Sequence, residues 1–474
     1  MIQDFLINKI KEKLGFTPTS DQDKALRLMV AFMYDPNPHA LFVLKGYAGT
    51  GKTSLLGAIV KAFRELKQRF VLLAPTGRAA KNFSNLADYP AYTIHKRIYR
   101  EEAFGNDTFV INNNLTPRTL FIVDEASMIY NEGTGNSMFG TGRLLNDLLG
   151  YVYSAAGCKL VFSGDAAQLP PVGEEESPAL STAGLERYGF KVWETELTEV
   201  VRQKEKYGIL SNATYLRRLI AGGDFLQLPR FYFHPDGNMH NLPGDELVET
   251  LETCYDRDGI DDTMVVCRSN KRANIYNQGI RNQILGREEE LSGGDRILVV
   301  KNNYYWPEQN GCKDIKFIAN GDMAIVRRIR NVRELYGFHF ADATLTFPDY
   351  NDCEMDTTVL LDTLLSDAPA LTKEQNERFY NAVSEDYADI PEKKERIKGI
   401  KADIYYNALQ IKYGYAITCH KAQGGQWGNV FLDQGYMTDE MLTPEYFRWL
   451  YTAITRAARL LYLVNWPKQE TLSK

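Results

Sequence analysis

The stretch 41-LFVLKGYAGTGKTSLLGAIVKAF-63 decides the fold. It begins with an apolar run, turns through a glycine-rich segment from Gly46 to Thr53, and continues with apolar residues at helical spacing. The glycine-rich segment fits the pattern GxxxxGK(S/T), which requires a strand before it and a helix after it. The stretch therefore predicts an α/β fold with a parallel sheet and a phosphate-binding loop at the end of one strand.

The phosphate-binding loop assigns nucleotide chemistry to single residues. Lys52 is expected to reach the β and γ phosphates of ATP, and the hydroxyl of Thr53 is expected to coordinate Mg²⁺. The backbone N–H groups of Gly49, Thr50 and Gly51 are expected to surround the phosphates, because glycines let the chain approach them closely. ATP and Mg²⁺ are therefore the expected cofactors.

A second acidic signal lies in the stretch TLFIVDEASM at residues 119–128. Asp124 stands where a carboxylate would hold Mg²⁺, and Glu125 stands where a base would orient the attacking water. An acid pair at a strand end is usually only solvated, but a position about 70 residues after a phosphate loop favours the catalytic interpretation. The chain is therefore expected to hydrolyse ATP.

The length and composition are those of a globular protein with several domains. The 474 residues favour about two to four domains, and 44% hydrophobic with 24% charged residues matches the soluble average. No apolar run is long enough to span a bilayer, and the charged, amphipathic N-terminal segment lacks the features of a secretory signal. A cytoplasmic protein without a membrane partner is expected.

Cysteine usage and net charge bear on the remaining classes. Six scattered cysteines with no CxxC pair argue against a disulfide scaffold and against a zinc module. The net charge of -6 counts only weakly against nucleic acid, because a protein that holds a strand inside a cleft needs only local positive charge.

A further stretch, KLVFSGDAAQLPPVG at residues 159–173, carries a resemblance to a known family. It resembles motif III of the superfamily 1 helicases, and its QLPPV form is similar to superfamily 1B, the branch of RecD, Dda and Pif-type enzymes. The stretch leading into motif V looks most like the Dda helicases of T-even phage. The other motifs of the superfamily have matches in the correct order along the whole chain: Gln22 (Q motif), 74–81 (motif Ia), 93–96 (motif Ib), Arg202 (motif IV), 415–427 (motif V) and Arg456 (motif VI).

The resemblance implies roles for individual residues. Arg202 and Arg456 would stabilise charge on the transferring phosphate when two halves of the protein close, and Gln168 would report the phosphate state. Gln22 would read the adenine edge, and Gly424 would lie toward the nucleotide. The residues implied on the DNA-facing edge are Pro75, Thr76, His95, Pro171, Thr418, His420 and Lys421.

The motif V stretch YAITCHKAQGGQW, residues 415–427, also places a thiol beside an imidazole. A nucleophile made of Cys419 and His420 is disfavoured, because adjacent side chains diverge on a helix and point to opposite faces of a strand. A metal site is disfavoured, because no second Cys or His lies at ligand spacing. Cys419 is therefore expected to pack inward, with its neighbours facing DNA.

Two parallel sheets and two insertions are expected along the chain. Apolar strands are predicted at 41–45, 70–74, 120–123 and 159–163, and a second series at 263–270, 429–434 and 459–466. The resemblance implies RecA-like domain 1A at 1–96 and 119–190, a β-hairpin domain 1B at 97–118, RecA-like domain 2A at 191–294 and 411–474, and an SH3-like β-barrel domain 2B with a charged, helical projection at 295–410. A hairpin with no part in strand separation remains an alternative for 97–118.

The resemblance implies an ATP-dependent DNA helicase that moves 5′ to 3′ on single-stranded DNA and separates duplex in replication, repair or recombination. Its expected partners are single-stranded DNA and single-strand/duplex junctions, with single-stranded-DNA-binding or replication proteins as further candidates, and a monomer is expected. Two other classes stay open: a phosphate-loop ATPase without strand separation, against which the paired second half speaks, and an inactive DNA-binding subunit. Intact Lys52, Asp124 and Glu125 speak against the inactive subunit.

Overall fold

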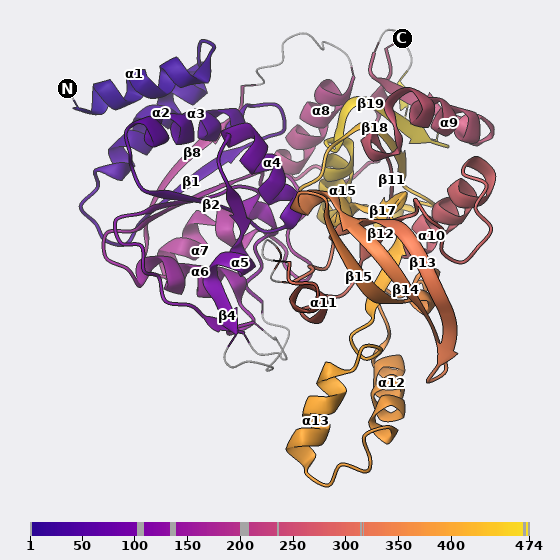
Figure 1. Ribbon diagram of the computed structural model, residues 1–474. Helices are drawn as coiled ribbons and strands as arrows, with labels where there is room; N and C mark the ends of the chain where they lie inside the picture. Colours follow the sequence, from indigo (N-terminus) through magenta and orange to yellow (C-terminus); the bar gives the residue numbers. More distant parts are fainter. Residues whose placement is uncertain are drawn as a thin grey trace.

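The computed structural model describes residues 2–101, 109–132, 139–199, 208–234, 237–312, 315, 317–467 and 471–472. Two parallel sheets lie side by side, each flanked by helices (Figure 1). A closed barrel lies beside the second sheet, and a pair of helices projects from it, away from both sheets (Figure 1). The expected α/β class with parallel sheets is confirmed.

The first sheet has six parallel strands in the order β3-β2-β6-β7-β1-β8. They are β1 (Ala40–Gly46), β2 (Phe70–Ala74), β3 (Ala91–Thr93), β6 (Leu120–Val123), β7 (Lys159–Gly164) and β8 (Lys191–Leu197). Successive residues of β1 enter different cores, since Phe42 packs on one face of the sheet and Val43 on the other. Burial on both faces explains the continuous apolar run in the sequence.

The position of β8 differs from the boundary drawn at residue 190. The sequence places residues from 191 onward in the second half, but β8 pairs with β1 along its whole length, from Lys191 beside Ala40 to Leu197 beside Gly46. The exposed and buried residues of β8 alternate at its end, as on a half-covered strand at the edge of a sheet. The first sheet therefore extends to Leu197.

Helices cover both faces of the first sheet. One face carries α1 (Ile2–Leu14), α2 (Ser20–Met33), α3 (Lys52–Glu65) and α4 (Gly77–Ala87), and the other carries α5 (Ile94–Ile98), α6 (Leu144–Tyr153) and α7 (Thr182–Arg187). These helices bury apolar residues toward the sheet, except that α1 packs on α2 and α3 as an outer layer. Among the described residues, no helix combines the length and apolar character needed to cross a membrane.

The second sheet has five parallel strands in the order β10-β19-β18-β11-β17. They are β10 (Met239–Leu242), β11 (Thr263–Cys267), β17 (Ala416–Thr418), β18 (Trp427–Asp433) and β19 (Ala457–Val464). The helices of this half are α8 (Ile209–Gly222), α9 (Leu247–Asp258), α10 (Asn270–Gly279), α14 (Cys419–Ala422) and α15 (Pro444–Ile454). The predicted second series of strands is confirmed.

The barrel is inserted between α10 and β17. Its strands are β12 (Arg296–Val299), β13 (Met323–Leu335), β14 (Phe338–Phe347), β15 (Cys353–Leu360) and β16 (Leu409–Tyr413). The chain between β15 and β16 forms α12 (Lys373–Glu385) and α13 (Lys393–Ala402), so the charged projection is helical. The segment between β12 and β13 contains α11 (Tyr305–Gln309) and reaches back toward the first half, where Phe317 joins the core beneath α5.

The expected hairpin is present at its base. β4 (Tyr99–Glu101) and β5 (Phe109–Ile111) pair in antiparallel register, with Tyr99 opposite Ile111. The tip of the hairpin, residues 102–108, lies outside the described residues.

Candidate functional site

The phosphate loop follows β1 and ends where α3 begins. Gly49 and Gly51 both have φ of 79°, a left-handed conformation that side chains rarely adopt, so these two glycines shape the loop. The ammonium of Lys52 donates to the backbone oxygens of Gly46 (2.5 Å) and Tyr47 (3.1 Å). The lysine therefore lies inside the curve of the loop, where phosphate oxygens could replace these carbonyls as its partners.

The acid pair stands at the end of β6, beside this loop. The hydroxyl of Ser163 donates to Asp124 Oδ1 (2.9 Å). Burial raises the pKa of Asp124, while Ser163 and the charge of Lys52 act against that rise. The hydroxyl of Thr53 also contacts this carboxylate, so the two predicted Mg²⁺ ligands lie together. A hydroxyl and a carboxylate are oxygen ligands of the kind that Mg²⁺ prefers, and the residues fit the ion.

Glu125 follows in a left-handed backbone conformation with φ of 53°, which is unusual for a residue with a side chain. Burial raises the pKa of its carboxyl, and the neighbouring charge of Asp124 adds to that rise. The guanidinium of Arg456 acts in the opposite direction, so it lies within electrostatic reach of Glu125. The second half thus contributes a cation to the acid pair of the first.

Hydrogen bonds hold Arg456 in place directly after α15. Its guanidinium donates to the backbone oxygens of Thr452 (3.0 Å) and Gly425 (3.1 Å) and to the hydroxyl of Thr455 (3.2 Å). The side chain is almost fully buried. A cation fixed in this way is pre-oriented for charge on a nearby phosphate. Arg202, the other predicted arginine, lies outside the described residues.

Gln22 is fully buried, with both ends of its amide bonded inside the protein. Its Nε2 donates to the backbone oxygen of Thr50 in the phosphate loop (3.0 Å), and its Oε1 accepts from the N–H of Thr19 (3.1 Å). The Thr19 hydroxyl in turn accepts from the N–H of Gln22, which completes a capping box at the start of α2. Nε2 has a second N–H and Oε1 a second lone pair, so adenine recognition would use these remaining positions or exchange one of the two partners.

Gln168 is buried in the loop after β7. Its Oε1 is buried and has no hydrogen-bond partner among the described residues, which is rare for a buried polar atom. The following residue, Leu169, is bonded through its backbone oxygen to Nε2 of Gln423 in the second half (2.8 Å). Gln168 therefore keeps a free acceptor on a loop that touches both halves.

Gly424 lies against α4 of the first half. Its backbone oxygen accepts from Nδ2 of Asn82 on α4 (3.1 Å). A Cβ at this position would lie 3.1 Å from the hydroxyl of Thr76, which caps α4 by accepting from the N–H of Ala79. Pro75 precedes this cap and is half-buried. Gly424 therefore forms a contact between the two halves.

Motif V residues line a groove that we call the His420 groove. It consists of two cavities, of about 640 Å³ and about 500 Å³, that share Val172 and His420 in their walls. Pro171 lines the first cavity, and Thr418 and Lys421 line the second. Three predicted residues of the second half and one of the first therefore meet in this groove.

The basic groups of the His420 groove are partly desolvated. Burial lowers the pKa of His420, and it lowers the pKa of Lys421 to about 8. The ammonium of Lys421 donates to Asn320 of the segment between β12 and β13. Cys419 is fully buried, and its thiol donates to the backbone oxygen of Trp449 (3.5 Å), so it packs inward as the alternation of side chains predicts.

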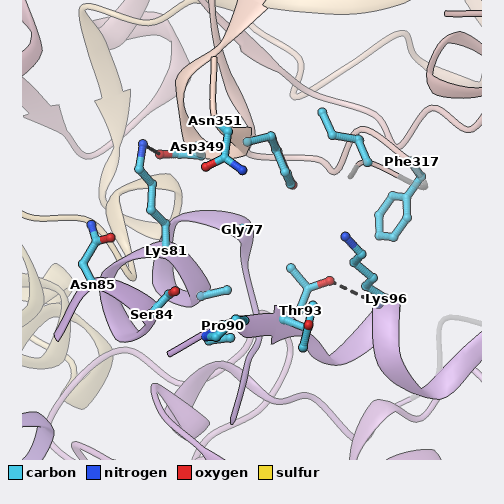
Figure 2. A pocket seen from close by; sticks show the side chains of 15 residues that line it. Gly77, Lys81, Ser84, Asn85, Pro90, Thr93, Lys96, Phe317, Asp349 and Asn351 are labelled. Atoms are coloured by element: carbon cyan, nitrogen blue, oxygen red, sulfur yellow. Dashed lines mark hydrogen bonds and ion pairs between the residues drawn. The ribbon is translucent and has the colours of Figure 1, made fainter. Parts of the chain in front are cut away.

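A third cavity, the Lys81 pocket, lies between α4, α5 and the barrel (Figure 2). Lys81 and Lys96 project into it from the ends of motifs Ia and Ib, with Lys81 near Asp349 and Lys96 beside Phe317 (Figure 2). Tyr92 adds a partly exposed ring to the wall. Two cations with two rings suit an anionic chain that carries flat bases.

The sequence reasoning did not single out Lys81 and Lys96, although each closes a motif that it quoted. It also missed the segment 268–271, which lines the His420 groove between the end of β11 and the start of α10. The sequence did contain a signal for each: Lys81 and Lys96 are the last residues of short motifs, and the segment 268–271 begins with a cation directly after a strand.

The ring of His95 lies among aromatic side chains. Its centroid is 4.9 Å from that of Phe139, 5.7 Å from that of Tyr99 and 6.2 Å from that of Phe317. Burial lowers the pKa of His95 to about 4, so the imidazole is neutral at physiological pH. Phe109 of the hairpin stacks on Phe139 in the same cluster. His95 is therefore part of the packing that supports the hairpin, and it does not line the Lys81 pocket.

Two family models match the chain. The model of an AAA domain matches residues 19–218, and the model of a UvrD-like helicase C-terminal domain matches residues 413–464. The first match contains the phosphate loop and the acid pair, and the second contains motif V and Arg456. The chain is therefore similar to an AAA domain in its first half and to the C-terminal domain of UvrD-like helicases near its end.

Known relatives are distant. An uncharacterized protein of Acanthamoeba polyphaga mimivirus is 23% identical over 90% of this chain and 95% of its own length. The ATP-dependent RecD2 DNA helicase of Deinococcus radiodurans is 26% identical over 88% of this chain, which spans only 46% of that relative. A crystal structure of Pif1 helicase from Bacteroides with ADP-AlF3 and single-stranded DNA is 14% identical, covers 97% of this chain and 95% of its own, and has a TM-score of 0.48. The expected special likeness to Dda helicases is not confirmed by these comparisons.

Proposed function

We propose that this protein is an ATP-dependent DNA helicase that moves 5′ to 3′ along single-stranded DNA and separates duplex by hydrolysing ATP. One observation carries the proposal: the second half presents Arg456 to the acid pair of the first half and presents His420 and Lys421 to a groove. A motor of this kind needs both contacts in one half, because hydrolysis must change the grip on the strand.

On the nucleotide side, each residue has a distinct task. Lys52 binds the β and γ phosphates, while Thr53 and Asp124 hold Mg²⁺. Mg²⁺, when bound, neutralises charge on the phosphate oxygens. Glu125 orients the attacking water and accepts its proton. Arg456, and Arg202 with it, stabilises the charge that develops on the transferring phosphoryl group when the halves close.

On the DNA side, the proposed contacts come from both halves. Lys81 and Lys96 bind phosphates in the Lys81 pocket, where the rings of Tyr92 and Phe317 offer surfaces for bases. The His420 groove continues the contact through Pro171, Thr418, His420 and Lys421. Lys421 is the one cation among these four residues, and few full charges along the strand suit a protein that slides.

The remaining assignments rest on the family resemblance. We propose that the β4–β5 hairpin is the separating pin of domain 1B, and that the barrel with α12 and α13 is domain 2B. The direction of movement follows from the QLPPV form of motif III, and RecD2 of Deinococcus radiodurans bears the name of an ATP-dependent DNA helicase. Single-strand/duplex junctions are the proposed substrate, the protein acts as a monomer, and single-stranded-DNA-binding or replication proteins are candidate partners.

Strand displacement on duplexes with either a 5′ or a 3′ tail tests the proposal. ATP and Mg²⁺ should allow release of the labelled strand from the 5′-tailed duplex, and a nonhydrolysable analogue should not. Release from the 3′-tailed duplex alone would reverse the proposed direction. Hydrolysis stimulated by single-stranded DNA without release from either duplex would instead favour an ATPase that does not separate strands.

A further inference from the structure

The hydroxyl of Tyr451 joins one segment of the second half to two segments of the first half. Tyr451 lies on α15 of the second half and is almost fully buried. Its hydroxyl donates to Asp165 Oδ2 (2.7 Å), and its oxygen accepts from the N–H of Ala48 in the phosphate loop (3.0 Å). Burial raises the pKa of Tyr451 well above its ordinary value, so the hydroxyl stays protonated and remains a donor. One side chain thus joins the phosphate loop, the loop after β7 and α15.

The loop after β7, residues 165–169, is bonded to the second half at further points. The hydroxyl of Thr452 accepts from the N–H of Leu169 (2.8 Å), and the guanidinium of Arg448 donates to the backbone oxygen of Ala166. Both of these residues flank Tyr451 on α15. The loop therefore moves with α15 when α15 moves.

The same loop reaches the His420 groove. Asp165 Oδ1 accepts from the N–H of Ala167 (3.0 Å), which fixes the turn of the loop, and the backbone oxygen of Leu169 accepts from Nε2 of Gln423 (2.8 Å). Gln423 directly follows α14, which carries His420. Hydrogen bonds at both ends of the backbone segment 165–169 therefore connect the N–H of Ala48 with the segment that lines the groove.

We propose that Tyr451 is a positioning residue whose hydroxyl couples the nucleotide at the phosphate loop to the DNA strand in the His420 groove. The inference rests on the proposed function. A hydroxyl with a single proton can satisfy Asp165 and Ala48 together only in one arrangement of the three segments. When the phosphate loop closes around a nucleotide, the bond to Ala48 must be broken or α15 must follow, and either change reaches residues 165–169 and Gln423.

The test is the thermodynamic coupling between two ligands. The affinity for a fluorescent oligothymidine is measured with and without a nonhydrolysable ATP analogue, and the ratio of the two dissociation constants is the coupling factor. The Tyr451→Phe variant keeps the ring and loses the hydroxyl. The wild-type coupling factor is expected to be about five or more, and in Tyr451→Phe it should fall toward one. DNA affinity without nucleotide should change little, because Tyr451 does not line the groove.

A matched control is Tyr446→Phe on the same helix. Its hydroxyl donates to Gln434 Oε1 (2.7 Å), so this hydrogen bond lies within the second half. Both variants lose one buried tyrosine hydroxyl, so a general loss of stability would lower both melting midpoints alike. Only Tyr451→Phe should change the coupling factor.

The outcomes separate the inference from the proposed function. A wild-type protein whose hydrolysis does not respond to single-stranded DNA would end the proposed function. A responsive wild type together with an unchanged coupling factor in Tyr451→Phe would overturn the inference alone. If Tyr451→Phe does not fold, Asp165→Asn decides in its place, because it removes the charged acceptor of the same hydroxyl and should also lower the coupling factor. If both single variants fold, the double variant should lose no more coupling than either one, as expected for two partners in one interaction.

Discussion

The two sheets each contain a strand that turns into a helix at the point where a ligand is expected, and the two turns are built differently. Between β1 and α3 the chain uses glycines with positive φ and curls around the ammonium of Lys52. Between β11 and α10 it has no glycine, and Ser269 caps the helix by accepting from the N–H of Arg272 (3.3 Å). The first turn can enclose a compact phosphate group, whereas the second presents side chains to an open groove.

The difference teaches that a parallel sheet supplies only the position of a site. The residues at the end of the strand decide whether the site is an enclosing phosphate loop or an open groove. The two regions share one electrostatic property, because burial disfavours the charged form in both: it raises the pKa of the acids near the phosphate loop and lowers the pKa of the bases in the His420 groove. Four predictions test whether the two regions are as separate in function as they are in build.

The largest effect is expected from Lys52→Ala in the phosphate loop. Loss of the phosphate-binding ammonium should lower the rate of ATP hydrolysis by at least about 100-fold. Binding of single-stranded DNA without nucleotide should persist, because Lys52 lines none of the three cavities proposed for DNA. A coupled ATPase assay and fluorescence anisotropy measure the two properties. Hydrolysis at the wild-type rate in this variant would contradict the nucleotide site.

A double change of Lys81 and Lys96 to Ala should weaken DNA binding and leave hydrolysis without DNA intact. Each lost phosphate contact lowers the slope of log affinity against log salt by about 0.7 for single strands, so the double variant should lose about 1.4. Lys394→Ala on the projecting α13 is the matched control, since it removes an exposed lysine far from the pocket. An equal slope of log affinity against log salt in the wild type and the double variant would show that the Lys81 pocket does not bind DNA.

Within motif V, two neighbouring changes should have opposite outcomes. His420→Ala should raise the DNA concentration needed for half-maximal stimulation of hydrolysis, because His420 lines both cavities of the groove. Cys419→Ser should leave stimulation nearly unchanged, since serine can keep the hydrogen bond to the Trp449 backbone oxygen. An ATPase titration with single-stranded DNA compares them. A dead cysteine variant beside a normal histidine variant would reverse our interpretation of the stretch.

The smallest effect concerns Asp322, at the contact between the barrel and α4. Its Oδ2 accepts from the Tyr350 hydroxyl (2.8 Å) and from the N–H of Ala319 (2.7 Å), and burial raises its pKa to about 7. The folded state therefore binds a proton that the unfolded state releases near pH 4. The contribution of Asp322 to stability is fully present below about pH 4 and is lost as pH rises through about 7.

Asp322→Asn should flatten this dependence. Between pH 5 and pH 8 the melting midpoint of the wild type should fall by roughly 2 to 4 °C more than that of the variant. Differential scanning fluorimetry at matched ionic strength measures the difference. Parallel curves for the two proteins would show that Asp322 does not titrate in this range.

The sequence predicted the phosphate loop and the central strands well because their signals are local. A glycine-rich turn with a lysine determines its own conformation, and a strand buried on both faces is apolar throughout. β8 was misassigned because its partner β1 lies far away in the sequence, and nothing in residues 191–197 identifies that partner.

The surroundings of two candidate site residues differ in how far the sequence could predict them. The surroundings of His95 come from segments that are distant in the sequence, including Phe317 of the barrel insertion, so motif reasoning could not find them. The position of Gln22 could have been found, because Thr19 three residues before it gives the T-x-x-Q pattern of a capping box.

The order of strands in the second sheet has a consequence for how the chain folds during synthesis. β11 is an interior strand of that sheet, yet its neighbours β17 and β18 follow only after the whole barrel and the α12–α13 pair. All strands of the first sheet, in contrast, are complete by Leu197. The first half can therefore close its core while the ribosome is still making the barrel, whereas β11 must wait with unpaired edges until β17 and β18 emerge. Premature termination within the final motifs would leave a folded nucleotide-binding half attached to an aggregation-prone remainder.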